Sequence, residues 1–510
     1  MKNYLKYTLL IFLAGFYGCE PEFENSVDDP GFYSSGSADF SRYVAVGNSL
    51  TAGYTDGALF ISAQAYSYPN LMASKFQFVG GGEFNQPLMN DNIGGMKLGG
   101  TQILPNRLVL SVDANGNFSP VRMDAVPTTD AGTKLSGSFQ NLGVPGAKSY
   151  HLMAPGYGNV AGILQGTANP YFVRFSSSEN ATVIADAASQ DPTFFSLWIG
   201  NNDMLGYATS GGSGVDQTGN MNPETYETND ITDPNLFAAI FTQQVDALIQ
   251  NGAKGVVFNL PEVTAIPYFN TVPTRVIPLD ASTAAMLNSQ FEPYNNLILP
   301  GLQAAGIISS DEAQMRKINF VSGQNFPIMS DDELTDISNL LMGTPFNLPV
   351  ETAKLLGQLR QVNDDDLIVL TASSVIGTIP DTNNPLGIIG VSIPLEDQWV
   401  LTKKEQDRVK QATQAYNITI KTVAESRGLA FVDVNQALQR VANEGIPYDG
   451  GILTAQFVVG GTFSLDGVHP TPKGYAYITN LAIDAINRTY DATIPKVNVG
   501  DYPSLTLHNN

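Results

Sequence analysis

Short apolar runs alternate along the chain with longer segments in which apolar residues recur at helical spacing. Runs of this length, closed by glycine or by polar residues, are typical of buried strands. Parallel strands need long crossover connections that are usually helical, so this alternation predicts an α/β fold. We expect a three-layer α/β/α sandwich with a central, mostly parallel sheet. The predicted strands are 42–46, 194–199, 256–260 and 429–434.

Two of the connecting segments carry the start and stop signals of helices. Residues 233–252 begin with Asp-Pro and end with Asn-Gly, which places proline just inside the start and glycine just past the end. Residues 402–427 open with a capping box of Thr402 and Glu405 and are followed by glycine. Each helix precedes a predicted strand, as a parallel sheet requires.

Two other stretches interrupt the alternation. The first, at about 55–140, is rich in Gly, Asn and Pro and contains a predicted hairpin around residues 115–116. The second, at about 265–400, has no pattern that predicts its elements. We interpret both as insertions in a single domain that spans 41–490, followed by a C-terminal tail over 491–510.

The chain is acidic, with 26 Lys and Arg against 48 Asp and Glu and a formal net charge of −22. Nucleic-acid binding needs clustered basic surface, so DNA and RNA are not expected partners. Two acidic runs, at 331–333 and 364–366, are interpreted as solvated surface and not as metal ligands. The single Cys excludes an internal disulfide and a multi-cysteine zinc site, and three histidines leave few candidates for imidazole chemistry.

The N-terminus has the pattern of a secretory signal. Residues 1–18 carry Lys2 and Lys6 and then an apolar run that is shorter than the ~20 residues of a membrane-spanning helix. Gly18 before Cys19 resembles the cleavage site of bacterial lipoproteins, which implies lipidation of Cys19. The alternative is an ordinary secretory signal followed by an incidental cysteine.

The segment after Cys19 is polar, acidic and rich in Gly, Ser and Pro, so residues 19–40 are predicted to form a flexible tether. Glu20, Glu22 and Glu24 resemble the surface-export signals of Bacteroidetes lipoproteins, although an acidic spacer would look the same. We expect a lipid-anchored protein of the bacterial cell envelope, in the outer membrane, with surface exposure left open.

Four short motifs occur in a fixed order along the chain. They are Gly47–Leu50, Asn141–Gly146, Gly200–Asp203 and Asp466–Pro470. Together they resemble the GDSL/SGNH hydrolases, α/β/α esterases named for a Ser, a Gly, an Asn and a His. The resemblance implies an SGNH-type sandwich with long insertions. It covers roughly residues 40–60, 135–150, 194–265 and 402–488.

Ser49, Asp466 and His469 supply the residue types of a catalytic triad. Ser49 follows a predicted strand, and reactive residues of parallel sheets lie on such loops. A serine is a weak nucleophile and needs a base, for which His469 is the candidate. Asp466 stands three residues before His469, close enough to orient the imidazole. Taken singly, Ser49 would be a turn serine and His469 a loop histidine; the four ordered motifs favour catalysis.

The resemblance also implies an oxyanion hole made by the backbone N–H groups of Ser49 and Gly146 and the side-chain amide of Asn202. Gly143 competes for the glycine position, but the Val-Pro-Gly spacing favours Gly146. Asn48 stands where the family usually has Asp. Asn has the shape of Asp and keeps one hydrogen-bond acceptor, but it carries no charge. We therefore expect Asn48 to support the loop and not to take part in catalysis.

Three other residues are candidates of a weaker kind. His151 could line the pocket, although a packing role is the preferred interpretation. His508 lies in a polar tail and is not expected to matter. Trp198, beside the third motif, is interpreted as a core residue.

These features predict a serine ester hydrolase of the cell envelope that acts on an acyl or acetyl ester of a lipid or an acetylated glycan. Its expected partners are that substrate and the membrane, and no metal or organic cofactor is implied. The alternative is a non-catalytic surface lipoprotein that binds glycan or lipid on a degenerate hydrolase fold.

Overall fold

The computed structural model describes residues 30–505 except 113–115 and 117. The predicted signal peptide 1–18, Cys19 and His508 lie outside the described residues. Within the described part of the chain, no helix is long and apolar enough to cross a membrane.

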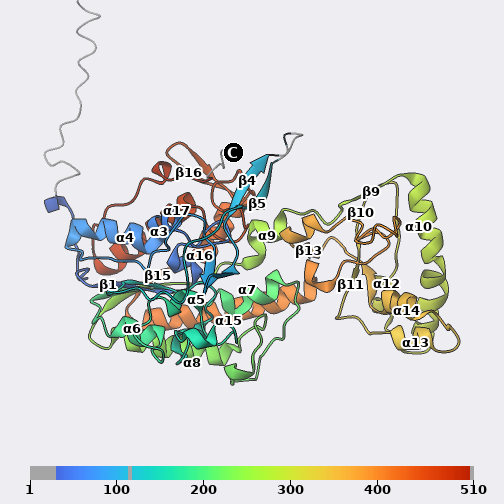
Figure 1. The fold of residues 1–510 in the computed structure, drawn as a ribbon, viewed down its shortest axis with the longest axis horizontal. Helices are drawn as coiled ribbons and strands as arrows, with labels where there is room; N and C mark the ends of the chain where they lie inside the picture. The colour runs from blue at the N-terminus through green and yellow to red at the C-terminus, as the bar shows by residue number, and fades with distance from the viewer. Residues whose placement is uncertain (1–29, 113–115, 117, 506–510) are drawn as a thin grey trace, which may run out of the picture.

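A five-stranded sheet forms the centre of the molecule (Figure 1), and every strand in it is parallel to its neighbours. Both β1 and β7 are buried along their whole length, which explains their continuous apolar sequence. The spatial order of the strands is β15 (Ala430–Val432), β8 (Lys254–Phe258), β7 (Phe194–Trp198), β1 (Tyr43–Gly47) and β6 (Asn141–Gly143).

Helices cover both faces of this sheet (Figure 1), so the predicted three-layer α/β/α sandwich is confirmed. One face is covered by α4 (Tyr68–Phe76) and α17 (Pro472–Tyr490), which pack against each other. The other face is covered by α6 (Val183–Ala188), α8 (Pro234–Ile249) and α15 (Lys403–Arg427).

The two helices predicted from their end signals are present with those signals in use. The Asp233 side chain accepts hydrogen bonds from two N–H groups in the first turn of α8. In α15, Thr402 and Glu405 form the reciprocal capping box, and Gly428 closes the helix at φ 64°. The capping position holds Glu405 in a fully buried location.

The first predicted insertion contains two antiparallel hairpins. The predicted hairpin is confirmed, with β4 (Leu108–Val112) pairing with β5 (Phe118–Arg122). The second pairs β2 (Met96–Leu98) with β3 (Thr101–Leu104). In Figure 1, β4 and β5 project from the main body on the side that faces the second insertion.

Much of the second predicted insertion folds as a lobe beside the main body (Figure 1), with a hydrophobic cluster of its own that runs from Ile277 to Val391. Its helices surround this cluster, and two short antiparallel pairs complete it, β9 with β10 and β11 with β12. The elements are β9 (Ile277–Leu279), α10 (Ala281–Pro293), α11 (Leu299–Ala304), α12 (Ser310–Met315), β10 (Gly323–Asn325), β11 (Ile328–Ser330), α13 (Ser338–Met342), α14 (Val350–Gly357) and β12 (Leu359–Gln361).

The acidic runs in this lobe correct the sequence interpretation. They were expected to be solvated, but Asp331 and Asp366 are buried on either side of Arg360. The Nε atom of Arg360 lies 2.5 Å from Asp331 Oδ2, and its Nη1 atom lies 2.6 Å from Asp366 Oδ2. Paired charges of this kind can be buried, whereas isolated ones cannot. The prediction was wrong for these two residues because their partner is distant in the sequence from the first run.

The predicted tether also ends earlier in the chain than expected. Ala38 and Phe40 were placed in the flexible segment 19–40, but both belong to the main hydrophobic core. The aromatic ring of Phe40 stacks on that of Phe76, with centroids 4.3 Å apart. A single large aromatic side chain is enough to anchor a polar segment, so the folded part begins before residue 41.

Candidate active site

Ser49 stands at the turn between β1 and the short helix α2 (Ser49–Ala52), at the carboxyl end of the sheet. Asn48 caps this helix, since its side-chain oxygen accepts the N–H of Leu50 at 3.0 Å. The first N–H groups of a helix have no partner within the helix. The N–H of Ser49 is one of these, and it has no hydrogen-bond partner in the described part of the chain.

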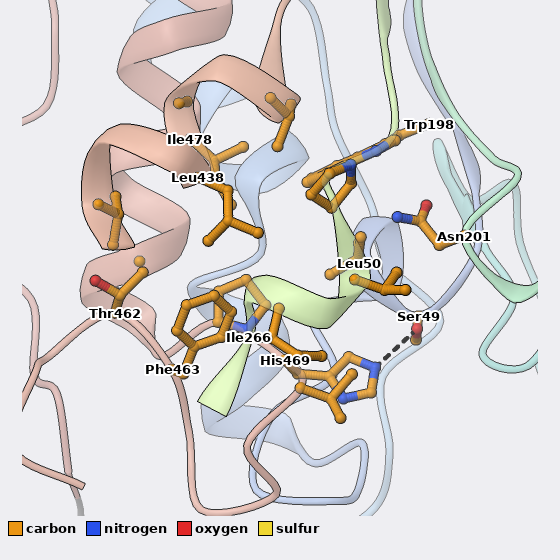
Figure 2. Close-up of a pocket in the computed structure, with 18 of the residues that line it drawn as sticks. Ser49, Leu50, Trp198, Asn201, Ile266, Leu438, Thr462, Phe463, His469 and Ile478 are labelled. Carbon is orange, nitrogen blue, oxygen red and sulfur yellow. Dashed lines mark hydrogen bonds between the residues drawn. The ribbon is translucent and has the colours of Figure 1, made fainter. Parts of the chain in front are cut away.

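The structure brings Ser49, His469 and Asp466 into one hydrogen-bonded chain. His469 Nε2 lies 2.9 Å from Ser49 Oγ, as the dashed line in Figure 2 shows, and His469 Nδ1 lies 2.8 Å from Asp466 Oδ2. Ser49 and His469 are separated by 420 residues in the sequence. The His469 and Asp466 side chains are each 14% exposed, so water reaches the pair only partly.

Asp466 is held as an anion. Burial alone would raise its pKa, but the adjacent His469 ring and the N–H groups of His469 and Val468 hold the pKa at about 2. Further hydrogen bonds come from the N–H of Gly57 at 2.9 Å and the hydroxyl of Ser464 at 3.0 Å. The carboxylate is therefore both charged and fixed at neutral pH, as a group that orients an imidazole must be.

The segment just after Ser49 also contributes to this site, which the sequence did not predict. The Tyr54 ring lies 4.6 Å from the His469 ring, and Asp56 accepts the N–H of Leu465 at 3.1 Å. Burial raises the pKa of Asp56 to about 6, against the hydrogen bond from Leu465. The signal in the sequence for Tyr54 and Asp56 was their position a few residues after Ser49. A chain that leaves a tight turn stays near that turn for several residues.

Gly146 has the features expected of a backbone donor beside a substrate. Its φ is 82°, a Cβ added there would meet no atom within 4 Å, and its N–H has no partner among the described residues. The competing Gly143 differs, because its N–H donates to Asn141 Oδ1 at 2.9 Å and a Cβ there would lie 2.2 Å from the nitrogen of Ala52. The free N–H favours Gly146 over Gly143.

Asn202 begins α7 (Asn202–Thr209) and is oriented by a hydrogen bond from its side-chain nitrogen to the carbonyl of Ala147 at 2.9 Å. An amide group has two N–H donors, so this bond leaves one available. Asn202 lines the same pocket as Ser49 and His469. Gly146 is not among the lining residues, but it follows β6, whose Gly143 pairs with Gly47 at the end of β1.

An apolar pocket begins at Ser49 and His469 and extends toward α17 and α16 (Val434–Asn443), as Figure 2 shows. The empty space along this pocket, open solvent included, amounts to about 780 Å³. Ser49 and His469 occupy one end, and the confirmed core residue Trp198 forms part of the wall. Other apolar lining residues are Leu50, Ile266, Leu438, Phe463 and Ile478.

A second and larger hollow opens on the other side of His469. It encloses about 2620 Å³ of space, open solvent included, between the β4–β5 hairpin, the η8 turn (Leu370–Ser374) and the start of the lobe. Arg122, Tyr268 and Ile277 are among its lining residues. His469 lines both hollows, so a molecule bound at Ser49 has space on two sides.

His151 packs away from this site, which confirms its preferred interpretation. Its ring stacks on Tyr157 at 4.8 Å, and its Nδ1 accepts the N–H of Lys148 at 3.1 Å. Burial, together with the nearby Lys148 charge, lowers the pKa of His151 to about 4. The ring is therefore neutral at pH 7 and positions the segment after Gly146.

Comparisons with known proteins do not assign this chain to a family. No family model and no curated protein matches it. Among solved structures it is similar to an extracellular lipase from Streptomyces rimosus, with 12% sequence identity and a TM-score of 0.28 over 87% of this chain and 98% of that chain. A similarity at this level carries no argument about activity, so the function has to be argued from the geometry of the site.

Proposed function

We propose that the protein is a serine ester hydrolase that cleaves esters of apolar acyl chains. The observation that carries the proposal is the position of Ser49 Oγ, 2.9 Å from His469 Nε2 at the mouth of an apolar pocket. A nucleophile in contact with an oriented base is the arrangement that acyl transfer requires. The four motifs that resemble the GDSL/SGNH hydrolases support the same assignment.

In the proposed reaction, Ser49 Oγ attacks the ester carbonyl while His469 Nε2 takes its proton. Asp466 stabilises the resulting imidazolium through the 2.8 Å contact to Nδ1, and His469 then gives the proton to the leaving alcohol. Water releases the acyl group in a second, equivalent cycle. The N–H groups of Ser49 and Gly146 and the amide of Asn202 stabilise the oxyanion, and each such donor is typically worth ~2.7–4 kcal/mol.

The shape of the pocket favours an acyl lipid over an acetylated glycan as the substrate. An acetyl group has a single methyl carbon to bury, whereas this pocket continues from Ser49 to Leu438 and Ile478. Burial of each additional CH₂ group contributes ~0.8 kcal/mol, so an apolar chain gains binding energy that an acetyl group cannot. The larger hollow beyond His469 has room for the alcohol part of the ester.

The alternative is a binding protein on a degenerate hydrolase fold, and Asn48 in place of the usual Asp would favour it if the substitution had no structural use. The structure gives Asn48 a structural use, as the cap of α2. Its presence is therefore not a sign of lost activity. A protein that only binds its ligand would have no use for the hydrogen bonds that connect Ser49 to His469 and His469 to Asp466 at the mouth of the pocket.

The proposal includes the location. A signal peptide over 1–18 and a lipid on Cys19 would anchor the enzyme in the cell envelope, where lipid esters are available. Metabolic labelling with a radioactive fatty acid tests this directly. Label in the wild-type chain that the Cys19→Ser variant lacks supports the anchor, and equal label in both would contradict it.

Hydrolysis of p-nitrophenyl acetate, butyrate and dodecanoate by residues 20–510 tests the activity. We expect kcat/KM to rise with chain length and to be lost in Ser49→Ala. Ser322→Ala, an exposed serine of the lobe, is the matched control and should behave as wild type. Acetate release from an acetylated glycan without cleavage of the longer esters would contradict the acyl-chain assignment. A folded protein that cleaves none of them would favour the binding protein.

A further inference from the structure

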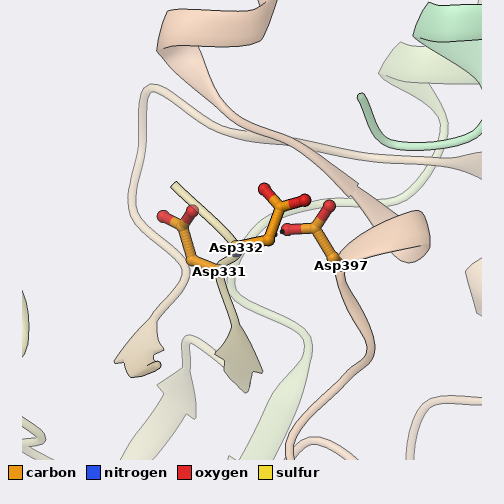
Figure 3. A group of neighbouring side chains, drawn as sticks. All are labelled: Asp331, Asp332 and Asp397. Atoms are coloured by element: carbon orange, nitrogen blue, oxygen red, sulfur yellow. Dashed lines mark hydrogen bonds between the residues drawn. The ribbon is translucent and has the colours of Figure 1, made fainter. Parts of the chain in front are cut away.

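A group of carboxylates from three separate segments gathers where the lobe meets the start of α15. Asp331, Asp332 and Glu333 follow β11, Asp397 lies in the turn η9 (Asp397–Trp399), and Glu405 lies in the first turn of α15. Oxygens of Asp331, Asp332 and Asp397 lie within 4.8 Å of one another (Figure 3), and the same holds for Asp332, Glu333 and Glu405.

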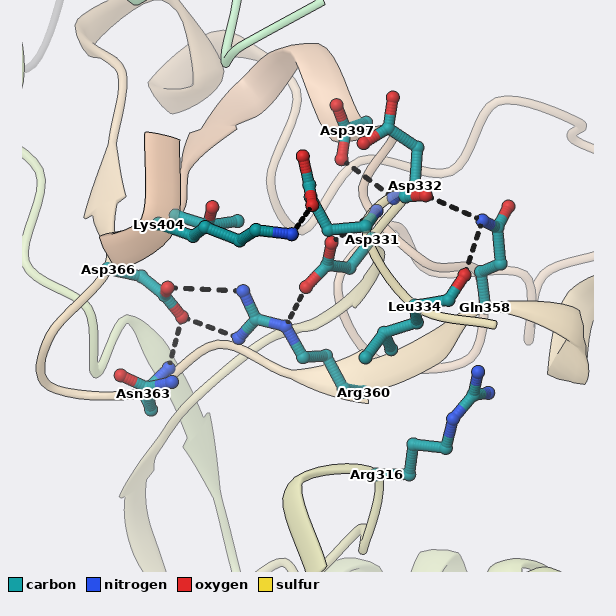
Figure 4. A network of polar contacts seen from close by, with 12 residues as sticks. Arg316, Asp331, Asp332, Leu334, Gln358, Arg360, Asn363, Asp366, Asp397 and Lys404 are labelled. Carbon is teal, nitrogen blue, oxygen red and sulfur yellow. Dashed lines mark hydrogen bonds and ion pairs between the residues drawn. The ribbon is translucent and has the colours of Figure 1, made fainter. Parts of the chain in front are cut away.

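Neighbouring cations neutralise only part of this group. Arg360 pairs with Asp331, as Figure 4 shows, and also with Asp366. Lys404 and Arg408 both pair with Glu333. In the described part of the chain, Asp332, Asp397 and Glu405 form no ion pair. Three carboxylates are therefore left to repel one another.

Two oxygens of these three residues are buried and have no hydrogen-bond partner among the residues that the structure describes. They are Glu405 Oε1 and Asp397 Oδ2. The other oxygen of each residue is engaged, since Glu405 Oε2 accepts the N–H of Thr402 at 2.7 Å and Asp397 Oδ1 accepts the N–H of Asp332 at 3.1 Å. Glu405 is completely buried, so water does not reach Oε1, the carboxylate oxygen that takes no part in the capping box. An unsatisfied buried carboxylate oxygen carries a large desolvation penalty.

The backbone after α7 packs against the Glu405 carboxylate and against the main chain of Asp397. Gly211 and Gly212 have φ values of 62° and 83°, a conformation that disfavours other residues. A Cβ on Gly212 would lie 2.2 Å from Glu405 Oε1, and one on Gly211 would lie 2.4 Å from the carbonyl oxygen of Asp397. Side chains are thus excluded from the space beside the unpartnered oxygen.

We propose that Asp332, whose oxygens lie within 4.8 Å of those of Asp397 in one group and of Glu405 in the other, binds a calcium ion together with these two residues and so joins the lobe to the main body. Carboxylate oxygens at 2.3–2.6 Å are the ligands that Ca²⁺ prefers, and its flexible coordination accepts ligands from separate segments. Asp332 belongs to both groups of neighbouring oxygens and is exposed, so it gives the ion a route of entry. Smaller Mg²⁺ demands a regular octahedron and retains its waters, which a half-enclosed group of this kind does not favour.

Calcium titration of the purified chain by isothermal calorimetry, after treatment with EDTA, tests the site. We expect one equivalent of Ca²⁺ to bind to the wild type and the dissociation constant to rise at least tenfold in both Asp397→Asn and Glu405→Gln. The amide oxygen that Glu405→Gln introduces would still accept the N–H of Thr402, so the helix cap is preserved. Asp407→Asn is the control, since Asp407 is exposed on the same helix and pairs with Lys403.

Thermal unfolding with 1 mM CaCl₂ and with EDTA provides the second measurement. Calcium should raise the Tm of the wild type and of Asp407→Asn but not that of the two site variants, because a ligand stabilises only the state that binds it. No saturable binding at millimolar Ca²⁺ would overturn the proposal. Binding that is unchanged in Asp397→Asn and Glu405→Gln would also overturn it, because the ion would then lie elsewhere.

Discussion

Asn48 donates a side-chain hydrogen bond to Asn201 at 3.2 Å, and this contact joins the two turns that carry Ser49 and Asn202. Both asparagines are buried, and the strands that lead into them are paired at Gly47 and Trp198. Asn48 therefore links the proposed nucleophile to a proposed oxyanion donor. Its neutral amide suits this place, since it offers one donor to Asn201 and one acceptor to Leu50.

Replacement of Asn48 by alanine should lower both stability and activity. The variant loses the cap of α2, which is typically worth ~0.5–2 kcal/mol, and a buried hydrogen bond worth about 1 kcal/mol. Urea unfolding should therefore show a loss of about 1–3 kcal/mol. Asn48→Asp keeps the cap acceptor and should lose less. Equal stability of the alanine variant and the wild type would show that the contact does not support the turn.

The low pKa of Asp466 predicts a specific dependence of stability on pH. Its pKa is about 2 in the folded protein against 3.8 ordinarily, so the folded state binds its proton less tightly than the unfolded state does. A carboxylate of this kind contributes stability above about pH 4, and the contribution of about 2 kcal/mol is lost as the pH falls through 2. Asp466→Asn removes the titrating group. The free energy of unfolding, measured between pH 5 and pH 2, should fall less steeply in the variant.

Activity provides a separate readout of the same residue. Asp466→Asn should keep its hydrogen-bonding shape but no longer stabilise the charged form of His469. A loss of about 10⁴-fold in kcat is the expected size for a triad of this kind. A loss below tenfold with the fold intact would indicate that Asp466 does not assist His469 in the reaction.

How much of this could be predicted from the sequence depends on the range of each interaction. Local signals predicted the strands next to Ser49 and Trp198, because each signal lies within a few neighbouring residues. The same holds for the helix that Thr402 and Glu405 cap. The triad could be proposed because its members stand in short motifs. Its geometry could not, since Ser49 and His469 meet across 420 residues.

Burial of charge was the least predictable feature. Asp331 and Asp332 are adjacent in the sequence, yet one is buried against Arg360 and the other is exposed. Nothing in an acidic run identifies which member will meet a distant arginine. The capping motif likewise predicts the position of Glu405 on α15 but not the unpartnered oxygen at its other end. Such features depend on tertiary packing, which the local pattern does not contain.

The pocket beyond Ser49 should set the preferred acyl length. Leu438→Trp places a larger side chain in the wall near α17 and should lower kcat/KM for the dodecanoate ester by tenfold or more, about the energy of two buried CH₂ groups. The acetate ester, which does not reach this wall, should react at the wild-type rate. Leu386→Trp, at a leucine 76% exposed on the lobe, is the control. An equal loss on both esters would indicate general damage by overpacking and would not support a chain-binding pocket.

Gly146 allows a comparison in which backbone strain is matched. Gly146 and Gly252 have φ values of 82° and 83°, and a Cβ at either position meets nothing within 4 Å. Replacement by alanine should therefore lower the free energy of unfolding by a similar amount at both sites, about 1–2 kcal/mol for an L-residue in the left-handed region. Gly252 follows α8, far along the chain from the site residues, so Gly252→Ala should retain its activity. Gly146→Ala should lose kcat, because the new methyl group would stand in the open space beside an unpartnered N–H. Equal activity of the two variants, measured on the same ester, would remove Gly146 from the proposed oxyanion hole.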